Sequence, residues 1–210
     1  MKIVLPFQWP VVTPYTVPIY LGGPVEGGGD WQNSFLTHFI FSSVHSWSDS
    51  FRKRILPHII FYVPCEWDHN HDLVEYFTEK YEIVKDVFSH ELEKSFTNWS
   101  LSNCGLSASG GLVLYGMFPE SKEYPRKDGV PYAHVTMFEL GYSLSHIKTL
   151  SREMALFVGV HEDFPDGNLM YDSFQTIIQD DVWCEENTRE VNSPEVFADW
   201  ISGCIESSFL

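Results

Sequence analysis

Apolar runs of strand length alternate with amphipathic stretches along most of this 210-residue chain. Four runs are rich in aliphatic and aromatic side chains and predict buried strands: 15–21 (YTVPIYL), 58–64 (HIIFYVP), 110–118 (GGLVLYGMF) and 154–160 (MALFVGV). Between them, apolar positions recur every three or four residues, which predicts helices: one with Asp30 as its N-cap, a long helix or two in series over 72–99, and two more over 135–148 and 193–208.

Strands that alternate with helices are typical of an α/β protein, in which helices cover a parallel sheet. We therefore predict a flavodoxin-like or Rossmann-like parallel sheet with helices on both faces. In such sheets, ligands bind beyond the carboxyl ends of the strands. Three loops follow predicted strand ends, at 22–30, 64–72 and 117–134, and we expect them to meet at one site.

Length and charge narrow the class of protein. The length suits a single domain over residues 1–210. The chain carries 29 acidic and 13 basic residues, for a formal charge of −16, and such a surface repels the phosphate backbone of a nucleic acid polymer. A nucleotide held in a pocket remains compatible with this charge, because the electrostatics of a pocket are local.

The cysteines and the N-terminus indicate a cellular compartment. Four cysteines lie far apart and form no CxxC pair, which is more typical of a reduced, cytoplasmic protein than of a disulfide scaffold: Cys65, Cys104, Cys184 and Cys204. The first residues, MKIVLPFQWP, make a poor signal peptide. No apolar run reaches the ~18 residues that a membrane span needs, so we expect no membrane partner.

The segment IYLGGPVEGGGDWQ (19–32) places glycines and a proline between a predicted strand and a predicted helix. In such a turn, backbone N–H groups can approach an anion, and the helix dipole adds attraction. The spacing matches neither the dinucleotide GxGxxG motif nor the P-loop. The pattern alone supports a ligand cradle and a flexible turn equally, and Glu26 would oppose a bound phosphate.

Three further groups could carry chemistry. Glu139 lies one turn into a predicted helix, either as a carboxylate that complements the helix dipole, which the periodicity favours, or as a nucleophile for glycosyl transfer. His69 and His71 lie among acidic residues and could bind a metal, but their segment is more typical of a polar loop before a helix, so we expect no metal and no cofactor. Ser107, in GLSASGG, precedes a strand and not a helix, which excludes a nucleophile elbow.

Segments found in the same order resemble the nucleoside 2-deoxyribosyltransferase-like family. They are IYLGGP…DWQ, GGLVLYGMFPE, and VTMFELGYSLSH followed by ALFVGVHED, within residues 17–165. The most specific piece is the T-x-x-E-x-G pattern of Thr136, Glu139 and Gly141. The resemblance implies a flavodoxin-like fold and cleavage of the N-glycosidic bond of a nucleoside or nucleotide.

The resemblance also implies roles for individual residues. Glu139 aligns with the carboxylate that attacks the anomeric carbon, and Tyr20 aligns with a tyrosine that helps to position it. Asp30, or an acid in the 120–128 loop, is a candidate for protonating the departing base. The candidates for substrate binding are Gly22, Gly23, Pro24, Gly28, Gly29, Trp31, Met117, Phe118 and His134. Family members often complete the site with a neighbouring subunit, which predicts a homo-oligomer.

The chain departs from the family pattern just before the nucleophile. Family transferases carry an acidic pair there, whereas this chain has Ala133, His134 and Val135. A helical insert around 72–99 and a C-terminal helical extension over 166–210 also fall outside the resemblance.

These departures keep two other hypotheses open. The missing acids favour a non-catalytic nucleotide-binding or sensing module of the same fold. A weaker alternative is a structural or assembly protein, in which exposed Trp9, Trp47 and Trp183 would make subunit contacts.

Overall fold

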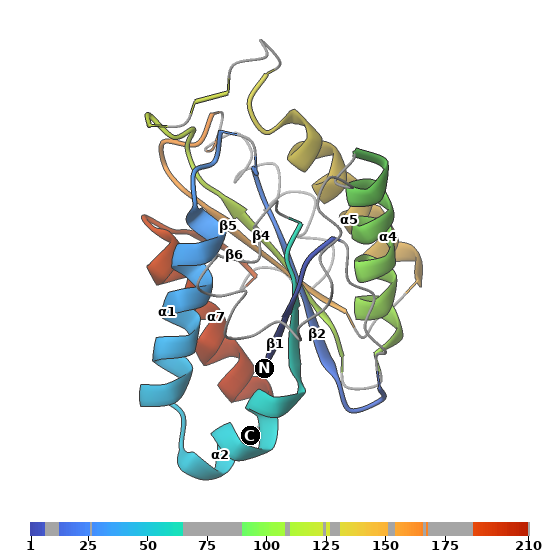
Figure 1. Ribbon diagram of the computed structural model, residues 1–210, viewed down its shortest axis with the longest axis vertical. Helices are drawn as coiled ribbons and strands as arrows, with labels where there is room; N and C mark the ends of the chain where they lie inside the picture. Colours follow the sequence, from blue (N-terminus) through green and yellow to red (C-terminus); the bar gives the residue numbers. More distant parts are fainter. Residues whose placement is uncertain are drawn as a thin grey trace. The chain divides into compact units, whose positions relative to one another are not determined.

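The computed structural model contains one parallel sheet of six strands (Figure 1). The described residues are 1–6, 13–25, 27–64, 90–107, 110–123, 125–126, 131–150, 154–165, 167 and 187–209. The strands are β1 (Lys2–Val4), β2 (Val17–Gly22), β3 (Ile59–Tyr62), β4 (Leu112–Met117), β5 (Ala155–Val160) and β6 (Thr188–Glu190). The helices are α1 (Trp31–His45), α2 (Asp49–Ile55), the 3-10 turn η1 (Leu56–His58), α4 (His90–Leu106), α5 (His134–Leu150) and α7 (Pro194–Phe209).

The strand order is β1-β3-β2-β4-β5-β6. If the short β1 is set aside, the remaining order is β3-β2-β4-β5-β6. With β2 counted as strand 1, this is the order 2-1-3-4-5 of flavodoxin. The α/β class predicted from the sequence is therefore confirmed. The order reverses between β2 and β4, and doubly wound sheets bind ligands where the order reverses.

The chain divides into two compact units. The first unit is made of three segments: 1–22, 49–113 and 143–155. Within it, β3 pairs in parallel with both β1 and β2, so that Phe61 stands opposite Ile3 on one side and Ile19 on the other. These three side chains are buried. Helix α4 packs on β2, where Thr97 Oγ1 lies 3.3 Å from Tyr20 Oη.

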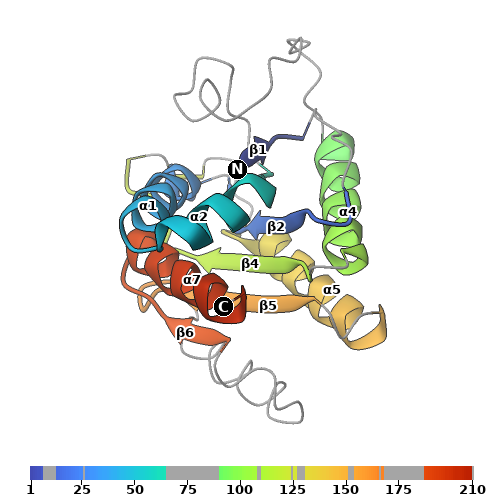
Figure 2. The same cartoon turned by 90° about the horizontal axis from the view of Figure 1, so that it is seen from below.

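The second unit is also made of three segments: 23–48, 114–142 and 156–210. Within it, α1 and α7 lie side by side (Figure 2). The rings of Phe35 on α1 and Phe197 on α7 have centroids 5.1 Å apart. Phe197 also lies 6.4 Å from Phe118, directly after β4. The helix pair is thereby fixed against the carboxyl end of that strand.

The predicted elements correspond well to the observed ones. Each of the four predicted strands is present, as β2, β3, β4 and β5, and the two later helices are present as α5 and α7. Ser193 Oγ accepts a 3.3 Å hydrogen bond from the Val196 N–H, so α7 is capped as expected. None of the helices in the described ranges is long and apolar enough to cross a membrane.

The helix predicted to end at residue 99 continues to Leu106, so that boundary was wrong. Ser100 and Cys104 are fully buried and extend the buried face that begins at Phe96. Cys104 Sγ lies 3.7 Å from the Pro18 carbonyl oxygen. The small side chains on this face of α4 therefore let the helix approach β2 closely. Small polar side chains do not register as an apolar pattern, which explains the error. The remainder of that prediction, 72–89, lies outside the described residues.

Trp47 was expected to be exposed and is buried, with 4% of its surface accessible. Its indole N–H donates a 3.3 Å hydrogen bond to the Ser202 carbonyl oxygen, and its ring meets Phe39 edge to face at 5.8 Å. The chain leaves α1 after His45 and places this ring between α1 and α7. Trp9 and Trp183 lie outside the described residues.

Candidate functional site

The glycine loop folds back onto the start of α1 within the second unit. Trp31 Nε1 donates a 2.8 Å hydrogen bond to the Pro24 carbonyl oxygen. Gly23 has φ +154°, and a Cβ there would lie 2.3 Å from Trp31 Cζ2 and 2.6 Å from the Gly116 carbonyl oxygen. Only glycine allows this approach, so the loop has a defined shape near the tryptophan.

The loop after β4 contacts the glycine loop. The Ser121 N–H donates a 2.6 Å hydrogen bond to the Gly27 carbonyl oxygen. The Trp31 and Phe118 rings have centroids 5.3 Å apart. The expected meeting of loops 22–30 and 117–134 is therefore confirmed by direct contacts. The third loop is described only as far as residue 64, and Glu26 also lies outside the described residues.

A basic residue lies beside the glycine loop, although the loop itself contains none. A Cβ at Gly27 would lie 3.2 Å from both Cβ and N of Arg126 and 3.3 Å from Glu120 Oε1. The Arg126 N–H in turn donates a 2.7 Å hydrogen bond to that Glu120 oxygen. Arg126 is half-buried. Its position after a predicted strand end was the one sequence feature that could have placed it near the loop.

The start of α5 is tied to the end of β4. Tyr132 Oη donates a 2.9 Å hydrogen bond to the Phe118 carbonyl oxygen. Burial raises the pKa of the Tyr132 hydroxyl, and the negative charge of Glu120 raises it further. Ala133, the residue before the helix, has φ +59° and is buried. A residue with a Cβ costs about 1–2 kcal/mol in this left-handed conformation, so the entry into α5 is held under strain.

Glu139 lies in the second turn of α5 and is half-buried. Its neighbours differ sharply in exposure, since Leu140 is 1% and Phe138 76% accessible. Thr136, one turn earlier, is buried at 5%. The residue therefore lies at the border between the buried and the exposed face of the helix.

Two of the predicted residues belong to the first unit. Tyr20 is fully buried, and its hydroxyl lies 3.3 Å from Thr97 Oγ1. Gly22 is the last residue of β2 and is buried. The expected role of Tyr20 beside Glu139 stays a prediction.

Asp30 occupies the N-cap position of α1 as expected, but its side chain makes no capping hydrogen bond. Its Oδ2 instead accepts a 2.7 Å hydrogen bond from Asn33 Nδ2, and the residue is exposed. This contact gives no support to Asp30 as the acid.

The remaining candidates play different parts. Gly28 and Gly29 belong to the glycine loop, and a Cβ at Gly29 would lie 3.4 Å from Ser121 Cβ. Met117 is buried, and its carbonyl oxygen accepts a 2.9 Å hydrogen bond from the His161 N–H. His134 is exposed, and its Nδ1 lies 3.1 Å from the carbonyl oxygen of Pro131, in its own turn.

Sequence reasoning missed Gln32, the second residue of α1. Its side chain is 98% buried, with 2% of its surface accessible. Its Nε2 has no hydrogen-bond partner in the part of the chain that the structure describes. Buried amide groups are nearly always hydrogen-bonded. This unpaired donor at the start of α1 is therefore an unusual feature.

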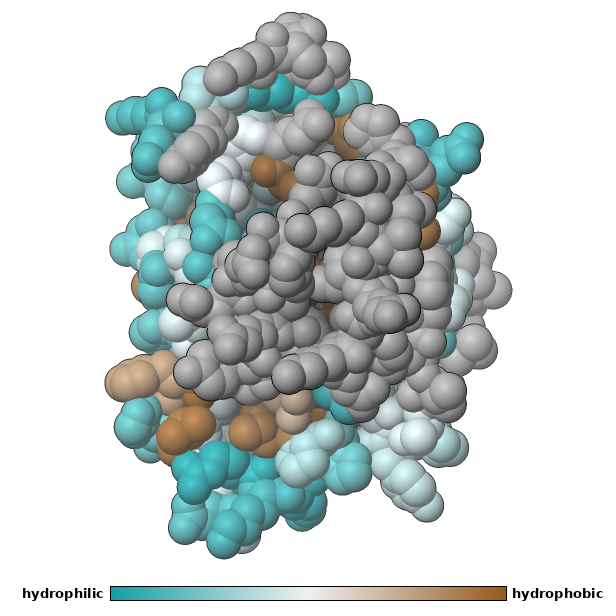
Figure 3. All heavy atoms as spheres, viewed as in Figure 1, coloured by the Kyte–Doolittle hydropathy of each residue, from teal (hydrophilic) through white to brown (hydrophobic). Residues whose placement is uncertain are grey.

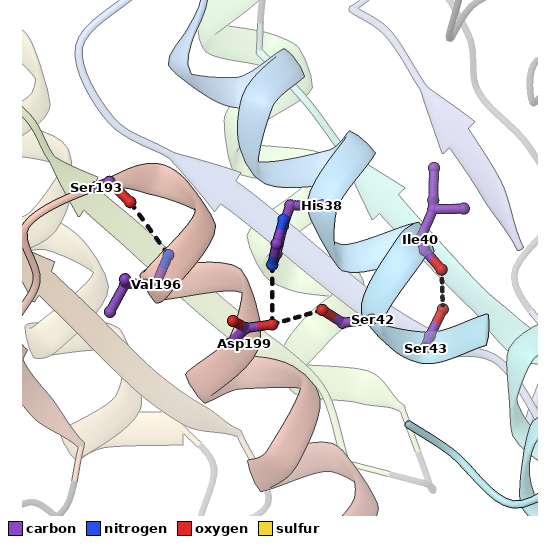
Figure 4. A network of polar contacts seen from close by, with 7 residues as sticks. All are labelled: His38, Ile40, Ser42, Ser43, Ser193, Val196 and Asp199. Atoms are coloured by element: carbon purple, nitrogen blue, oxygen red, sulfur yellow. Dashed lines mark hydrogen bonds and ion pairs between the residues drawn. The ribbon is translucent and has the colours of Figure 1, made fainter. Parts of the chain in front are cut away.

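A histidine, a serine and an aspartate also meet between α1 and α7 (Figure 4). Asp199 Oδ1 accepts a 2.5 Å hydrogen bond from Ser42 Oγ and lies 3.0 Å from His38 Nε2. In a catalytic triad the histidine stands between serine and acid, whereas here the aspartate stands between the other two. The cluster therefore joins the two helices and does not activate the serine.

No group of three His, Cys, Asp or Glu side chains suited to a metal ion occurs among the described residues. His69 and His71 lie outside them. Ser107 Oγ donates a 2.8 Å hydrogen bond to the Thr16 carbonyl oxygen, which is a structural role. The chain matches no family model, no curated protein and no solved structure.

Proposed function

We propose that this protein cleaves or transfers the N-glycosidic bond of a nucleoside or nucleotide, with Glu139 as the nucleophile. The observation that carries the proposal is the meeting of three segments at the end of β4. Each segment contacts residues that follow β4. The glycine loop accepts a hydrogen bond from the Ser121 N–H, Trp31 at the start of α1 contacts the Phe118 ring, and Tyr132 before α5 donates to the Phe118 carbonyl oxygen. Such strand-end loops carry the active sites of doubly wound folds.

The reaction proceeds in two balanced steps. In the first, a Glu139 carboxylate oxygen bonds to the anomeric carbon while the C–N bond breaks, its electron pair leaves with the base, and the base takes a proton from solvent water. The anionic carboxylate stabilises the oxocarbenium-like transition state. In the second, water or another base attacks the same carbon, gives up one proton to the solvent, and breaks the bond to Glu139, which leaves as a carboxylate. Water makes the enzyme a hydrolase, and a base makes it a transferase.

Two aromatic side chains support the glycine loop. The rings of Trp31 and Phe118 have centroids 5.3 Å apart and both side chains are buried, so they fix the shape of the loop around a substrate. The loop backbone at Gly28 and Gly29 approaches a ligand without side-chain interference. The loop itself carries no basic side chain, and glycosidic cleavage requires no cationic clamp on a transferring phosphoryl group.

A second candidate function is non-catalytic binding of a nucleotide. It is favoured by the entry to α5, where Ala133 and His134 stand in place of the family's acidic residues. Ala133 carries no polar group, and His134 Nδ1 lies near the carbonyl oxygen of Pro131. A protein of this kind would bind a nucleotide and leave it intact.

The test is turnover on a panel of 2′-deoxynucleosides and their 5′-monophosphates, with and without a free base. Glu139→Gln keeps the shape of the side chain and removes the nucleophile, so we expect at least about a thousandfold loss of released or exchanged base. A 2-fluoro sugar analogue, which slows the second step, should leave an adduct on Glu139 that mass spectrometry detects. Glu91→Gln, an exposed change on α4, is the control.

The outcomes separate the candidate functions. Base release that Glu139→Gln and the wild type share would refute Glu139 as the nucleophile. Ligand binding without release in either protein would instead support the non-catalytic module.

We further propose that the protein forms a homo-oligomer through α5 and acts in the cytoplasm. Val135, Phe138 and Tyr142 form an exposed apolar stripe on α5. A Cβ at Gly141 would meet nothing within 4 Å, which leaves room for a second helix. The three side chains of this stripe carry no charge, which suits self-association of a chain with a charge of −16.

This assembly is testable by sedimentation velocity. Phe138→Lys should give monomers. The control is Phe41→Lys, in the apolar patch over the C-terminal end of α1 (Figure 3), which should leave the oligomer intact. A monomeric wild type would refute the assembly. The buried Cys104 forms no disulfide bond with the described residues, in keeping with a reducing compartment.

A further inference from the structure

Gln32 and Thr188 are the side chains of the second unit that are buried without a hydrogen-bond partner among the described residues, and Gln32 is the one beside the glycine loop in sequence. Its side chain is 2% accessible, and Nε2 has no hydrogen-bond partner among the described residues. A buried donor without a partner lowers the free energy of unfolding by about 1–3 kcal/mol, and an apolar side chain of the same shape avoids this penalty. A methionine or leucine would therefore pack better in the free protein. The described residues offer this amide no partner, which makes it a candidate ligand contact.

The position of Gln32 in the helix sets the direction of its side chain. Long side chains on an α-helix point back towards the helix N-terminus. Gln32 is the second residue of α1, and from this preference we infer that its amide is directed towards the helix start, where the glycine loop joins α1. At that end, Trp31 binds the Pro24 carbonyl oxygen and contacts the Phe118 ring.

The polar groups at this point are hydrogen-bond donors. The first N–H groups of a helix have no partner within the helix, and Asp30 provides no side-chain cap for α1. Gln32 Nε2 adds a side-chain donor. A cluster of donors at a helix N-terminus fits a group that only accepts, such as a phosphate oxygen. A sugar hydroxyl or a base edge presents donors too and would leave them unpaired.

Charges near the subsite have both signs. The backbone N and the Cβ of Arg126 lie against Gly27, on the same side as Glu120 Oε1. Asp30 is the nearest carboxylate along the chain, and its Oδ2 accepts a hydrogen bond from Asn33. Glu120 Oε1 likewise accepts the Arg126 N–H. Both carboxylates are thus engaged by neighbouring donors, and the helix dipole adds attraction for an anion.

We propose that Gln32 and the first turn of α1 bind the 5′-phosphate of the substrate, so that the substrate class is a nucleoside monophosphate and not a free nucleoside. This inference rests on the proposed function. It adds Gln32 as a substrate-binding residue. It also selects the nucleotide over the nucleoside, a question that the sequence left open.

The experiment compares Gln32→Met with the wild type. Both proteins are titrated by calorimetry with four 2′-deoxynucleoside 5′-monophosphates, the matching deoxynucleosides and inorganic phosphate. The wild type should bind its preferred monophosphate at least tenfold more tightly than the nucleoside, with phosphate as a weak competitor. Gln32→Met should lose most of that preference, with the affinity for the nucleoside unchanged.

Thermal unfolding of the free proteins separates binding from a structural role. Because Gln32→Met removes an unsatisfied donor, its Tm should equal or exceed that of the wild type. Leu36→Met, one turn further along the buried face of α1, is the matched control and should keep the preference for the monophosphate. A lower Tm for Gln32→Met with an unchanged preference would overturn the proposal and make Gln32 a core residue.

The two proposals fail in different ways. Glu139-dependent turnover with equal affinity for nucleoside and monophosphate would overturn the phosphate subsite and leave the glycosidic activity standing. A Gln32-dependent preference for the monophosphate without turnover would support the subsite and overturn the activity. A wild type that binds none of the compounds would overturn the subsite.

Discussion

The indole nitrogen of Trp31 donates a 2.8 Å hydrogen bond to the carbonyl oxygen of Pro24, so the first residue of α1 holds the glycine loop in place. Trp31→Phe keeps an aromatic ring beside Phe118 and removes the donor. The buried Pro24 oxygen then loses its partner, and we expect a loss of about 1–3 kcal/mol in the free energy of unfolding. Urea denaturation measures this loss, and calorimetry should show weaker ligand binding.

A second tryptophan provides the control for this change. Trp200→Phe alters a ring of α7 that packs on Phe157 of β5 and on Phe197 of α7. It should lower stability through lost packing and leave ligand affinity unchanged. Equal effects of the two substitutions on ligand binding would show that the Trp31–Pro24 contact has no special part in the site.

Glycines at two positions should respond to alanine in opposite directions. At Gly23 a Cβ would lie 2.3 Å from Trp31 Cζ2 and 2.6 Å from the Gly116 carbonyl oxygen, at a φ of +154°. Gly23→Ala should therefore destabilise the protein by about 2–4 kcal/mol. At Gly203, inside α7, a Cβ meets nothing within 4 Å, so Gly203→Ala should stabilise it by about 0.5–1 kcal/mol. Urea midpoints that shift in the same direction would contradict this interpretation.

The fold was readable from the sequence where strands are buried on both faces. Such strands are continuous apolar runs, and Val113, Leu114 and Tyr115 in β4 are all fully buried. The strands β1 and β6 have three residues each, too few to form a pattern. The predicted helix ended at residue 99, seven residues before the end of α4, because Ser100 and Cys104 are small and partly polar although they are buried.

Only the part of the candidate site that is formed by consecutive residues was predictable from the sequence. The glycines and Trp31 are consecutive in sequence, and their turn pattern was visible. The Ser121–Gly27 hydrogen bond and the nearness of Arg126 join segments far apart in the chain, and no local pattern encodes such contacts. Gln32 was missed for another reason, because a polar residue in the first turn of a helix is usually exposed.

The polar contacts that His38 and Ser42 of α1 make with α7 share a single carboxylate oxygen. Asp199 Oδ1 accepts the Ser42 hydroxyl and lies 3.0 Å from His38 Nε2 (Figure 4). Asp199→Ala leaves the buried Ser42 hydroxyl unpaired and should cost about 1–2 kcal/mol in urea unfolding. Asp199→Asn keeps an acceptor oxygen and should cost less than half of that. Equal losses for the two variants would show that the helix pair depends on the charge and not on the hydrogen bond.

Two buried tyrosines should behave differently when their hydroxyls are removed. Tyr132 Oη donates to the Phe118 carbonyl oxygen, so Tyr132→Phe should cost about 1 kcal/mol at pH 8. Tyr62 Oη has no partner among the described residues, so Tyr62→Phe should be neutral or stabilising. Urea unfolding at pH 8 gives both values.

The same pair predicts a dependence on alkaline pH. Burial raises the pKa of both hydroxyls, with Glu120 adding to the effect at Tyr132 and Cys104 at Tyr62. As the pH rises through about 10, each tyrosine loses its proton in the unfolded chain and keeps it in the folded one, so stability falls. Each Phe variant removes one such group and should lose stability less steeply between pH 9 and pH 11. A slope identical to that of the wild type in both variants would show that neither hydroxyl has a raised pKa.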